Sequence, residues 1–175
     1  MSNVIMLKSG DYFDFDNPHE SRITIEGIAH SLSQQCRFTG HTPHFYSVAQ
    51  HCINCSHVAP KEFKLEALMH DVAEAFIGDV STPLKKMLPD YREIEERVER
   101  AVFAKLGCQY PMNPVIKTID RRMLVTEQHR IFKNTDYWLD ETPYDKNDIM
   151  DVYFKFRDMH DIRAEFMKIF TSSPR

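Results

Sequence analysis

Two histidines and two aspartates of this chain have side chains that can bind a divalent transition metal: His51, His70, Asp71 and Asp120. Neutral imidazole suits Zn, Co, Ni or Fe, and carboxylate suits harder ions such as Mn. The four residues are dispersed along the sequence, so a fold must gather them. They point to a single metal site, which an all-helical packing is able to assemble.

Glu74 follows His70 by four residues and Asp71 by three, so on a helix the three side chains share one face. Buried carboxylates need a compensating charge, and a metal ion is the simplest source of it. Each residue alone has a plainer explanation: His51 and His70 as hydrogen-bonded core histidines, the acids as helix surface. The joint pattern is less easily explained in this way, but composition and spacing alone leave both explanations open.

The cysteine pair Cys52-x-x-Cys55 resembles a zinc or redox motif at first sight. No second Cys-x-x-Cys accompanies it in the sequence, and the i, i+3 spacing on a helix suits two small buried side chains. We therefore interpret both cysteines as packing residues. The amino-terminal apolar run is too short for a signal peptide, so we expect a cytoplasmic protein whose cysteines are thiols.

Length and composition indicate one globular domain spanning residues 1–175. Hydrophobic residues make up 42% of the chain and charged residues 27%, which is ordinary for a globular protein. The net charge of −4 gives no overall field that would attract nucleic acid, so we expect no nucleic-acid partner. No stretch approaches the roughly 20 apolar residues of a membrane helix, so we expect no membrane partner either.

Hydrophobic periodicity predicts an all-α fold, a single compact bundle of about six or seven helices. The first twenty residues, with alternating Phe and Asp, indicate a short strand or an extended arm over the core, and Gly and Pro predict loops. Caps and periodicity place the other boundaries in the first half of the chain: a helix from Thr24, a loop over 37–46, a helix that begins at Ser47, and a helix from Pro60 to about Ile77 that ends at a left-handed Gly78. In the second half they predict a short helical turn from Ser81, a helix from a capping box at Asp90 to Gly107, and a helix from Pro114 to beyond His129. A polar loop over 134–147 and a last helix over roughly 148–170 follow.

Five stretches between about Arg37 and Glu127 resemble one known family in their residues and order: Arg37-Phe38, Ser47 to His51, Leu68 to Asp79, Thr82 to Lys85, and Asp120 with Glu127. The family is the HD-domain metal-dependent phosphohydrolases. The order H…HD…D is specific in combination, and H-D-x-x-E-x-x-x-G-D followed by T-P-x-K resembles its small nucleotidase branch. That branch includes bacterial 5′-deoxynucleotidases and phage dATP triphosphohydrolases.

The resemblance implies a role for each matching residue at the reaction centre. Glu74 would position or deprotonate the attacking water, and Asp79 would support that water or bind the sugar. The implied cofactor is a divalent transition metal (Co, Mn or Zn), with Mg as an ion for the phosphates. The implied metal ligands are His51, His70, Asp71 and Asp120.

The substrate side has four candidate residues. Arg37 would hold phosphate oxygens with its planar guanidinium, and Phe38 stands where relatives carry an aromatic, often Trp, that packs on the sugar and disfavours a 2′-hydroxyl. Lys85 is a second candidate for phosphate. Lys117, three residues before Asp120, would share its helix face and reach a β- or γ-phosphate.

These assignments predict an enzyme that hydrolyses 2′-deoxynucleotides at the α-phosphorus. The preferred activity is a dNTP triphosphohydrolase acting on dATP, because several cations lie near the motifs; the alternative is a 5′-deoxynucleotidase acting on dNMPs. Two other classes compete: a non-catalytic helical binding module, which would have lost a ligand or Glu74, and a nucleic-acid-binding protein, which the acidic balance disfavours. The resemblance also implies a homo-oligomer in a bacterium or a phage-infected bacterium.

Overall fold

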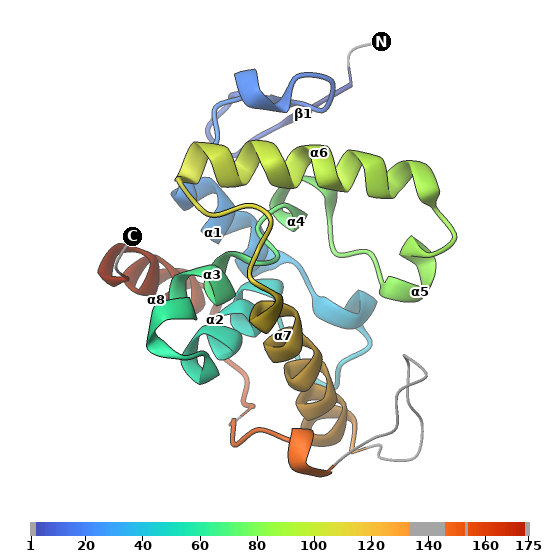
Figure 1. Ribbon diagram of the computed structural model, residues 1–175, viewed down its shortest axis with the longest axis vertical. Coiled ribbons are helices and arrows are strands. Elements are labelled where there is room, and N and C mark those ends of the chain that lie inside the picture. Colours follow the sequence, from blue (N-terminus) through green and yellow to red (C-terminus); the bar gives the residue numbers. More distant parts are fainter. Residues whose placement is uncertain (1–2, 134–145, 153, 174–175) are drawn as a thin grey trace.

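The computed structural model describes residues 3–133, 146–152 and 154–173, and most of them are helical (Figure 1). The predicted all-α bundle is therefore confirmed, with the addition of one small antiparallel sheet of β1 (Val4–Met6) and β2 (Tyr12–Asp14). The α-helices in chain order are α1 (Ile25–Gln34), α2 (Val48–Val58), α3 (Lys64–Met69), α4 (Glu74–Ile77), α5 (Thr82–Lys85), α6 (Pro89–Leu106), α7 (Pro114–Glu127) and α8 (Met159–Ser172).

Helix α2 is the centre of the bundle, since it packs against α1, α3, α7 and α8. Its start is fixed by Ser47, whose hydroxyl accepts a hydrogen bond from the Gln50 N–H at 3.1 Å, as the capping pattern predicts. Thr24 caps α1 in the same way through the Gly27 N–H. Helix α2 is thus buried and has a capped N-terminus.

The N-terminal hairpin covers the core, as expected for a short strand or arm. Phe13 of β2 is fully buried and stacks on Phe76 of α4, with ring centroids 4.2 Å apart. The apolar side chains of α1, α2, α3, α6 and α8 complete this core. Among the described residues, no helix has the length and apolarity needed to cross a bilayer.

The prediction of one continuous helix from Pro60 to Ile77 is wrong. Helix α3 ends at Met69 and α4 begins at Glu74, and the backbone between them turns tightly. The N–H of Val72 donates to the carbonyl of Met69 three residues earlier, and Glu74 donates to Asp71 likewise. Such i to i−3 bonds tighten the chain relative to an α-helix, so His70 and Asp71 project from a turn rather than from one helix face.

Several predicted boundaries differ from the structure at helix ends. Helix α8 begins only at Met159, where Asp158 caps it, rather than near residue 148. Gly78 has a positive φ of 79° but a ψ of 159°, so it is not the left-handed cap that was expected. Helix α6 begins at Pro89 without the predicted Asp90 capping box and ends at left-handed Gly107 as predicted.

The boundaries of helix α7 agree with the prediction. Helix α7 starts at Pro114 behind an Asn113 cap and continues as a π-turn over Gln128–Phe132, beyond His129 as predicted. Most of the predicted polar loop over 134–147 lies outside the described residues.

Glu99 on α6 gives a test of the packing of this helix. Burial and the nearby Glu95 carboxylate raise the pKa of Glu99 to about 7 from an ordinary 4.5. The ionised form therefore destabilises the folded state: the effect is absent below about pH 4, grows up to about pH 7 and stays constant above it. Glu99→Gln should raise the free energy of unfolding by about 1 kcal/mol near pH 8, allowing for partial solvent screening.

Denaturant unfolding near pH 8 and near pH 4 measures this effect. The variant should match the wild type at the lower pH, and the exposed Glu93→Gln should match it at both. Equal stability of wild type and Glu99→Gln at the higher pH would contradict the burial of this carboxyl.

Candidate metal centre

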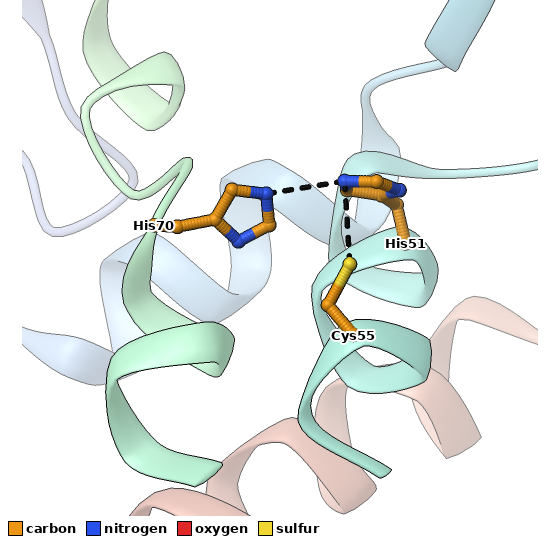
Figure 2. A group of neighbouring side chains, drawn as sticks. All are labelled: His51, Cys55 and His70. Atoms are coloured by element: carbon orange, nitrogen blue, oxygen red, sulfur yellow. Dashed lines mark hydrogen bonds between the residues drawn. The ribbon is translucent and has the colours of Figure 1, made fainter. Parts of the chain in front are cut away.

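Two buried imidazoles face each other at the centre of the bundle (Figure 2). The Nε2 atom of His51 on α2 lies 3.1 Å from the Nε2 atom of His70 in the turn after α3. Each ring uses its other nitrogen as a donor: His51 Nδ1 donates to Glu127 Oε1 at 2.5 Å, and His70 Nδ1 donates to the Ala67 carbonyl at 2.8 Å. In the neutral rings, both Nε2 lone pairs are therefore directed into the same space.

Two carboxylates complete the cluster from different elements. Asp120 on α7 places Oδ1 3.1 Å from His51 Nε2 and 3.7 Å from His70 Nε2. Asp71 places Oδ2 3.1 Å from His70 Nε2 and 3.6 Å from His51 Nε2. The structure thus brings together all four side chains that the sequence nominates as metal ligands.

The spacing of these four donor atoms fits one divalent cation. Metal–ligand bonds of about 2.0–2.2 Å to nitrogen and oxygen separate neighbouring ligand atoms by about 3–3.6 Å. The observed separations of 3.1 to 3.7 Å are close to that range. Two lone pairs 3.1 Å apart also repel unless a proton or a cation lies between them, and this nitrogen and oxygen donor set suits Zn, Co or Mn.

The two aspartates carry negative charge at neutral pH. Burial opposes ionisation of Asp71, but the adjacent His70 ring, which in its protonated form carries a positive charge and donates a hydrogen bond, lowers the pKa of Asp71 to about 2. Desolvation likewise opposes the ionised form of Asp120, but hydrogen bonds from the protonated forms of His51 and His70 hold its pKa well below the usual value. Two neighbouring anions beside two imidazoles provide the charge that a divalent ion requires.

Glu127 supports this cluster from behind. Its fully buried carboxylate accepts hydrogen bonds from His51 Nδ1, from the Tyr46 hydroxyl at 2.8 Å and from Arg37 Nη2 at 3.0 Å. Burial opposes its ionisation, but Arg37 and His51 together lower the pKa of Glu127. A carboxylate behind a metal-binding imidazole fixes the ring's tautomer and orientation, so Glu127 positions His51.

Sequence analysis did not predict the contacts that Glu127 makes with His51 and Tyr46. Glu127 entered only as part of the family resemblance, and 76 residues separate it from His51. No local spacing rule links residues that far apart, so only the fold reveals the contact.

Glu74 lies beside the cluster, at the start of α4. The Gln35 side chain donates to the Glu74 carbonyl at 3.0 Å, which ties α4 to the end of α1. Burial and the neighbouring Asp71 and Asp79 carboxylates raise the pKa of Glu74 well above its usual value. Its buried Oε2 atom has no hydrogen-bond partner among the residues that the structure describes, so this oxygen is available to a water molecule.

Asp79 and Lys85 lie near Glu74. Burial raises the pKa of Asp79, while the Arg37 charge acts in the opposite direction, which places Asp79 within the electrostatic reach of the site. Lys85 Nζ lies 3.7 Å from Glu74 Oε1 and 2.5 Å from Glu95 Oε1 on α6. Its ammonium is therefore already paired with carboxylates.

Arg37 and Phe38 border the cluster on a strained segment. The Arg37 guanidinium lies 3.7 Å from Asp71 and over the Phe38 ring, 5.3 Å from its centroid. The Phe38 ring in turn packs edge-on against Phe132, with centroids 5.0 Å apart. Phe38, Thr39 and Gly40 all have positive φ values, of 54°, 53° and 78°, a conformation that side chains other than glycine rarely adopt.

Lys117 is exposed on α7, one helical turn before Asp120. Among the described residues, none forms an ion pair or hydrogen bond with its side chain. Of the four predicted substrate residues, Arg37, Phe38 and Lys85 have contacts that place them near the centre, and the role of Lys117 stays a prediction.

The two cysteines of α2 are buried free thiols, as predicted. Their interpretation as packing residues is incomplete for Cys55, whose Sγ lies 3.6 Å from His51 Nε2 (Figure 2). The sequence signal was present in the i, i+4 spacing from His51, which puts both side chains on one face of α2.

Comparison with known proteins gives a family match over most of this region. The family model described as 5′-deoxynucleotidase YfbR-like matches residues 30–138. The chain is 47% identical over 126 residues to the Escherichia coli K12 protein named "Uncharacterized protein YfdR", covering 72% of this chain and 71% of that protein. It is 32% identical over 128 residues to "Uncharacterized protein RCAP_rcc00048" of Rhodobacter capsulatus, covering 65% of each chain.

Replacing Glu127 tests its support of the imidazole. Glu127→Gln should weaken binding of Zn²⁺ or Co²⁺ by about 10- to 100-fold, because the ring loses its charged hydrogen-bond acceptor. Isothermal titration calorimetry measures this affinity, and circular dichroism shows whether the variant is folded.

Tyr46→Phe is the matched control, since it removes one hydrogen bond to the same carboxylate and leaves the charge in place. Its metal affinity should stay within about threefold of the wild type, with stability lower by about 1 kcal/mol. Wild-type metal affinity in folded Glu127→Gln would contradict the positioning role.

Proposed function

The chain belongs to the YfbR-like 5′-deoxynucleotidase family of HD-domain phosphohydrolases, and from that premise we propose that it releases phosphate from 2′-deoxynucleoside 5′-monophosphates. The hydrolase class, the use of a divalent metal and a nucleotide substrate follow from the family. The proposal adds the substrate form and the roles of individual residues. It is supported above all by two observations: each imidazole Nε2 lies 3.1 to 3.7 Å from the other three donor atoms, and the buried Oε2 of Glu74 has no hydrogen-bond partner among the described residues.

In the proposed reaction, the oxygen of water forms a bond to phosphorus and the bond from phosphorus to O5′ breaks. The bonding pair goes to O5′, which takes up a proton, so the products are deoxynucleoside and phosphate. A divalent ion held by His51, His70, Asp71 and Asp120 would supply positive charge for the phosphate oxygens and acidify the water.

Glu74 is the proposed base in this reaction. Its Oε2 is buried without a partner among the described residues, and its carboxyl lies close enough to Asp71 for that charge to raise its pKa. A raised pKa brings a carboxyl nearer to the value at which it exchanges protons efficiently around neutral pH. The Lys85 ammonium, 3.7 Å from Oε1, favours the anionic form that accepts the proton.

The distribution of cations supports a monophosphate over a triphosphate. The sequence-based preference for dATP rested on several cations near the motifs. Lys85 pairs with Glu74 and Glu95, and Arg37 pairs with Glu127 and Asp71, so both of these cations already contact carboxylates. Arg37 is the principal candidate to bind phosphate oxygens in a bidentate manner, which is sufficient for one phosphate group. The dATP triphosphohydrolase stays a competing prediction.

Phe38 and Asp79 are the proposed sugar-facing residues. The Phe38 ring is held between the Arg37 guanidinium and the Phe132 ring, so its position at the rim of the centre is well defined. An apolar ring in that position would leave a 2′-hydroxyl without a hydrogen-bond partner, which disfavours ribonucleotides. Asp79 would accept a hydrogen bond from the sugar or from the attacking water.

A substrate profile tests the proposal directly. Purified protein loaded in turn with Co²⁺, Mn²⁺, Zn²⁺ or Mg²⁺ is assayed on dNMPs, the matching NMPs and dNTPs, with identification of the phosphate product. Orthophosphate from dNMPs, with slower turnover of NMPs, is the expected result. Release of intact triphosphate from dATP with dAMP unreacted would overturn the choice of monophosphate.

Replacing Glu74 tests its role as the base. Glu74→Gln should lower kcat by about 10² to 10⁴-fold, the usual contribution of a general base, while the bound metal per chain stays unchanged. Steady-state kinetics and elemental analysis measure the two quantities. The exposed Glu93→Gln is the control and should keep full activity, whereas near-normal turnover in Glu74→Gln would assign the base to another residue.

A further inference from the structure

Cys55 lies in direct contact with the imidazole pair. It follows His51 by one helical turn on α2 and is 1% exposed. Its Sγ lies 3.6 Å from His51 Nε2, and the ligand atoms of His51, Cys55 and His70 all lie within 4.8 Å of one another. Figure 2 shows the sulfur and both Nε2 atoms directed toward the same space.

The distance between sulfur and nitrogen fits joint coordination of one ion. Bonds of about 2.3 Å to sulfur and about 2.05 Å to nitrogen, at a tetrahedral angle, separate the two atoms by about 3.6 Å. The observed value is 3.6 Å. Without an ion, the same geometry lets the thiol donate to the His51 lone pair, so the sulfur is held in place in either state.

Cys52 has a different set of neighbours. It groups with His70 and Asp71 and has a hydrogen bond with the His70 ring. An ion bound by both imidazoles must lie between their Nε2 atoms, so Cys55 is the cysteine that faces it.

We propose that Cys55 is an additional, sulfur ligand of the ion held between His51 and His70, and that it selects borderline-soft ions such as Zn²⁺ and Co²⁺ over Mn²⁺ and Mg²⁺. The inference rests on the metal centre of the proposed function. Thiolate binds Zn²⁺ and Co²⁺ well and binds Mg²⁺ poorly, whereas carboxylate and imidazole alone discriminate less among these ions.

The surrounding charge bears on a third anionic ligand. Asp71 and Asp120 contribute two negative charges to the centre, which a divalent ion balances. The Arg37 guanidinium lies 3.0 Å from Glu127 Oε2 and 3.7 Å from Asp71 Oδ2, so its positive charge is shared between these two carboxylates. A thiolate ligand would add one net negative charge, and coordination to a divalent ion is sufficient to deprotonate a thiol.

Absorption spectroscopy of the Co²⁺-loaded protein tests the sulfur ligand without reference to activity. The wild type should show a sulfur-to-cobalt charge-transfer band in the near ultraviolet that saturates at one Co²⁺ per chain. Cys55→Ser should bind Co²⁺ without that band. Cys52→Ser, and Cys108→Ser at a thiol outside the cluster, should both keep it.

A competition titration measures the selectivity. Cys55→Ser should lower the affinity for Zn²⁺ relative to Mn²⁺ by at least about tenfold, since the lost ligand favours the softer ion. Cys52→Ser should leave this ratio within about threefold of the wild type.

The outcomes separate this inference from the proposed function. Stoichiometric Co²⁺ binding without the band, or a band lost in Cys52→Ser and kept in Cys55→Ser, would overturn the role of Cys55 and leave the metal centre intact. No Co²⁺ or Zn²⁺ binding at all would overturn both. An unchanged ratio of Zn²⁺ to Mn²⁺ affinity in Cys55→Ser would reject the selectivity.

Discussion

The rest of the centre depends on the hydrogen bonds that the buried carboxylate of Glu127 accepts. It accepts hydrogen bonds from His51, Tyr46 and Arg37, and so joins α7 to α2 and to the segment that follows α1. Hydrogen bonds to a charged group each contribute about 1.5–3 kcal/mol, which offsets the cost of burying the charge. This carboxylate therefore fixes the tautomer of the His51 ring and holds the Arg37 guanidinium beside the cluster.

The sequence predicts the parts of this protein that follow local rules. The cap at Ser47, the stop at Gly107 and the apolar faces of α1, α2 and α7 depend on residues within a few positions of each other, and all were predicted. The Asn113 cap follows the same kind of rule but was not predicted. The gathering of His51, His70, Asp71 and Asp120 was also expected, because their residue types and order resemble a known family.

The remaining features depend on tertiary contacts. The helix pattern runs through His70 without interruption, yet the backbone tightens there so that His70 can meet His51 on the neighbouring helix. The apolar residues between 149 and 156 have helical spacing, but helix α8 starts only where Asp158 can cap it. The cations nominated for phosphate were close in sequence to the motifs, and only the fold shows that Lys85 pairs with Glu95 of α6.

The three successive positive φ angles at Phe38, Thr39 and Gly40 have a consequence for how this scaffold diversifies. Left-handed backbone costs about 1–2 kcal/mol for a residue other than glycine, so this shape needs outside support. The support lies at the two ends of the loop that contains these residues. Cys36 and Ser47 form an isolated antiparallel β-bridge, and the Arg37 N–H donates to the Tyr46 carbonyl at 2.9 Å. Both anchors are main-chain contacts, so substitutions among residues 41–45 leave them in place. The side chains of this loop can therefore vary while the backbone of Arg37 stays anchored.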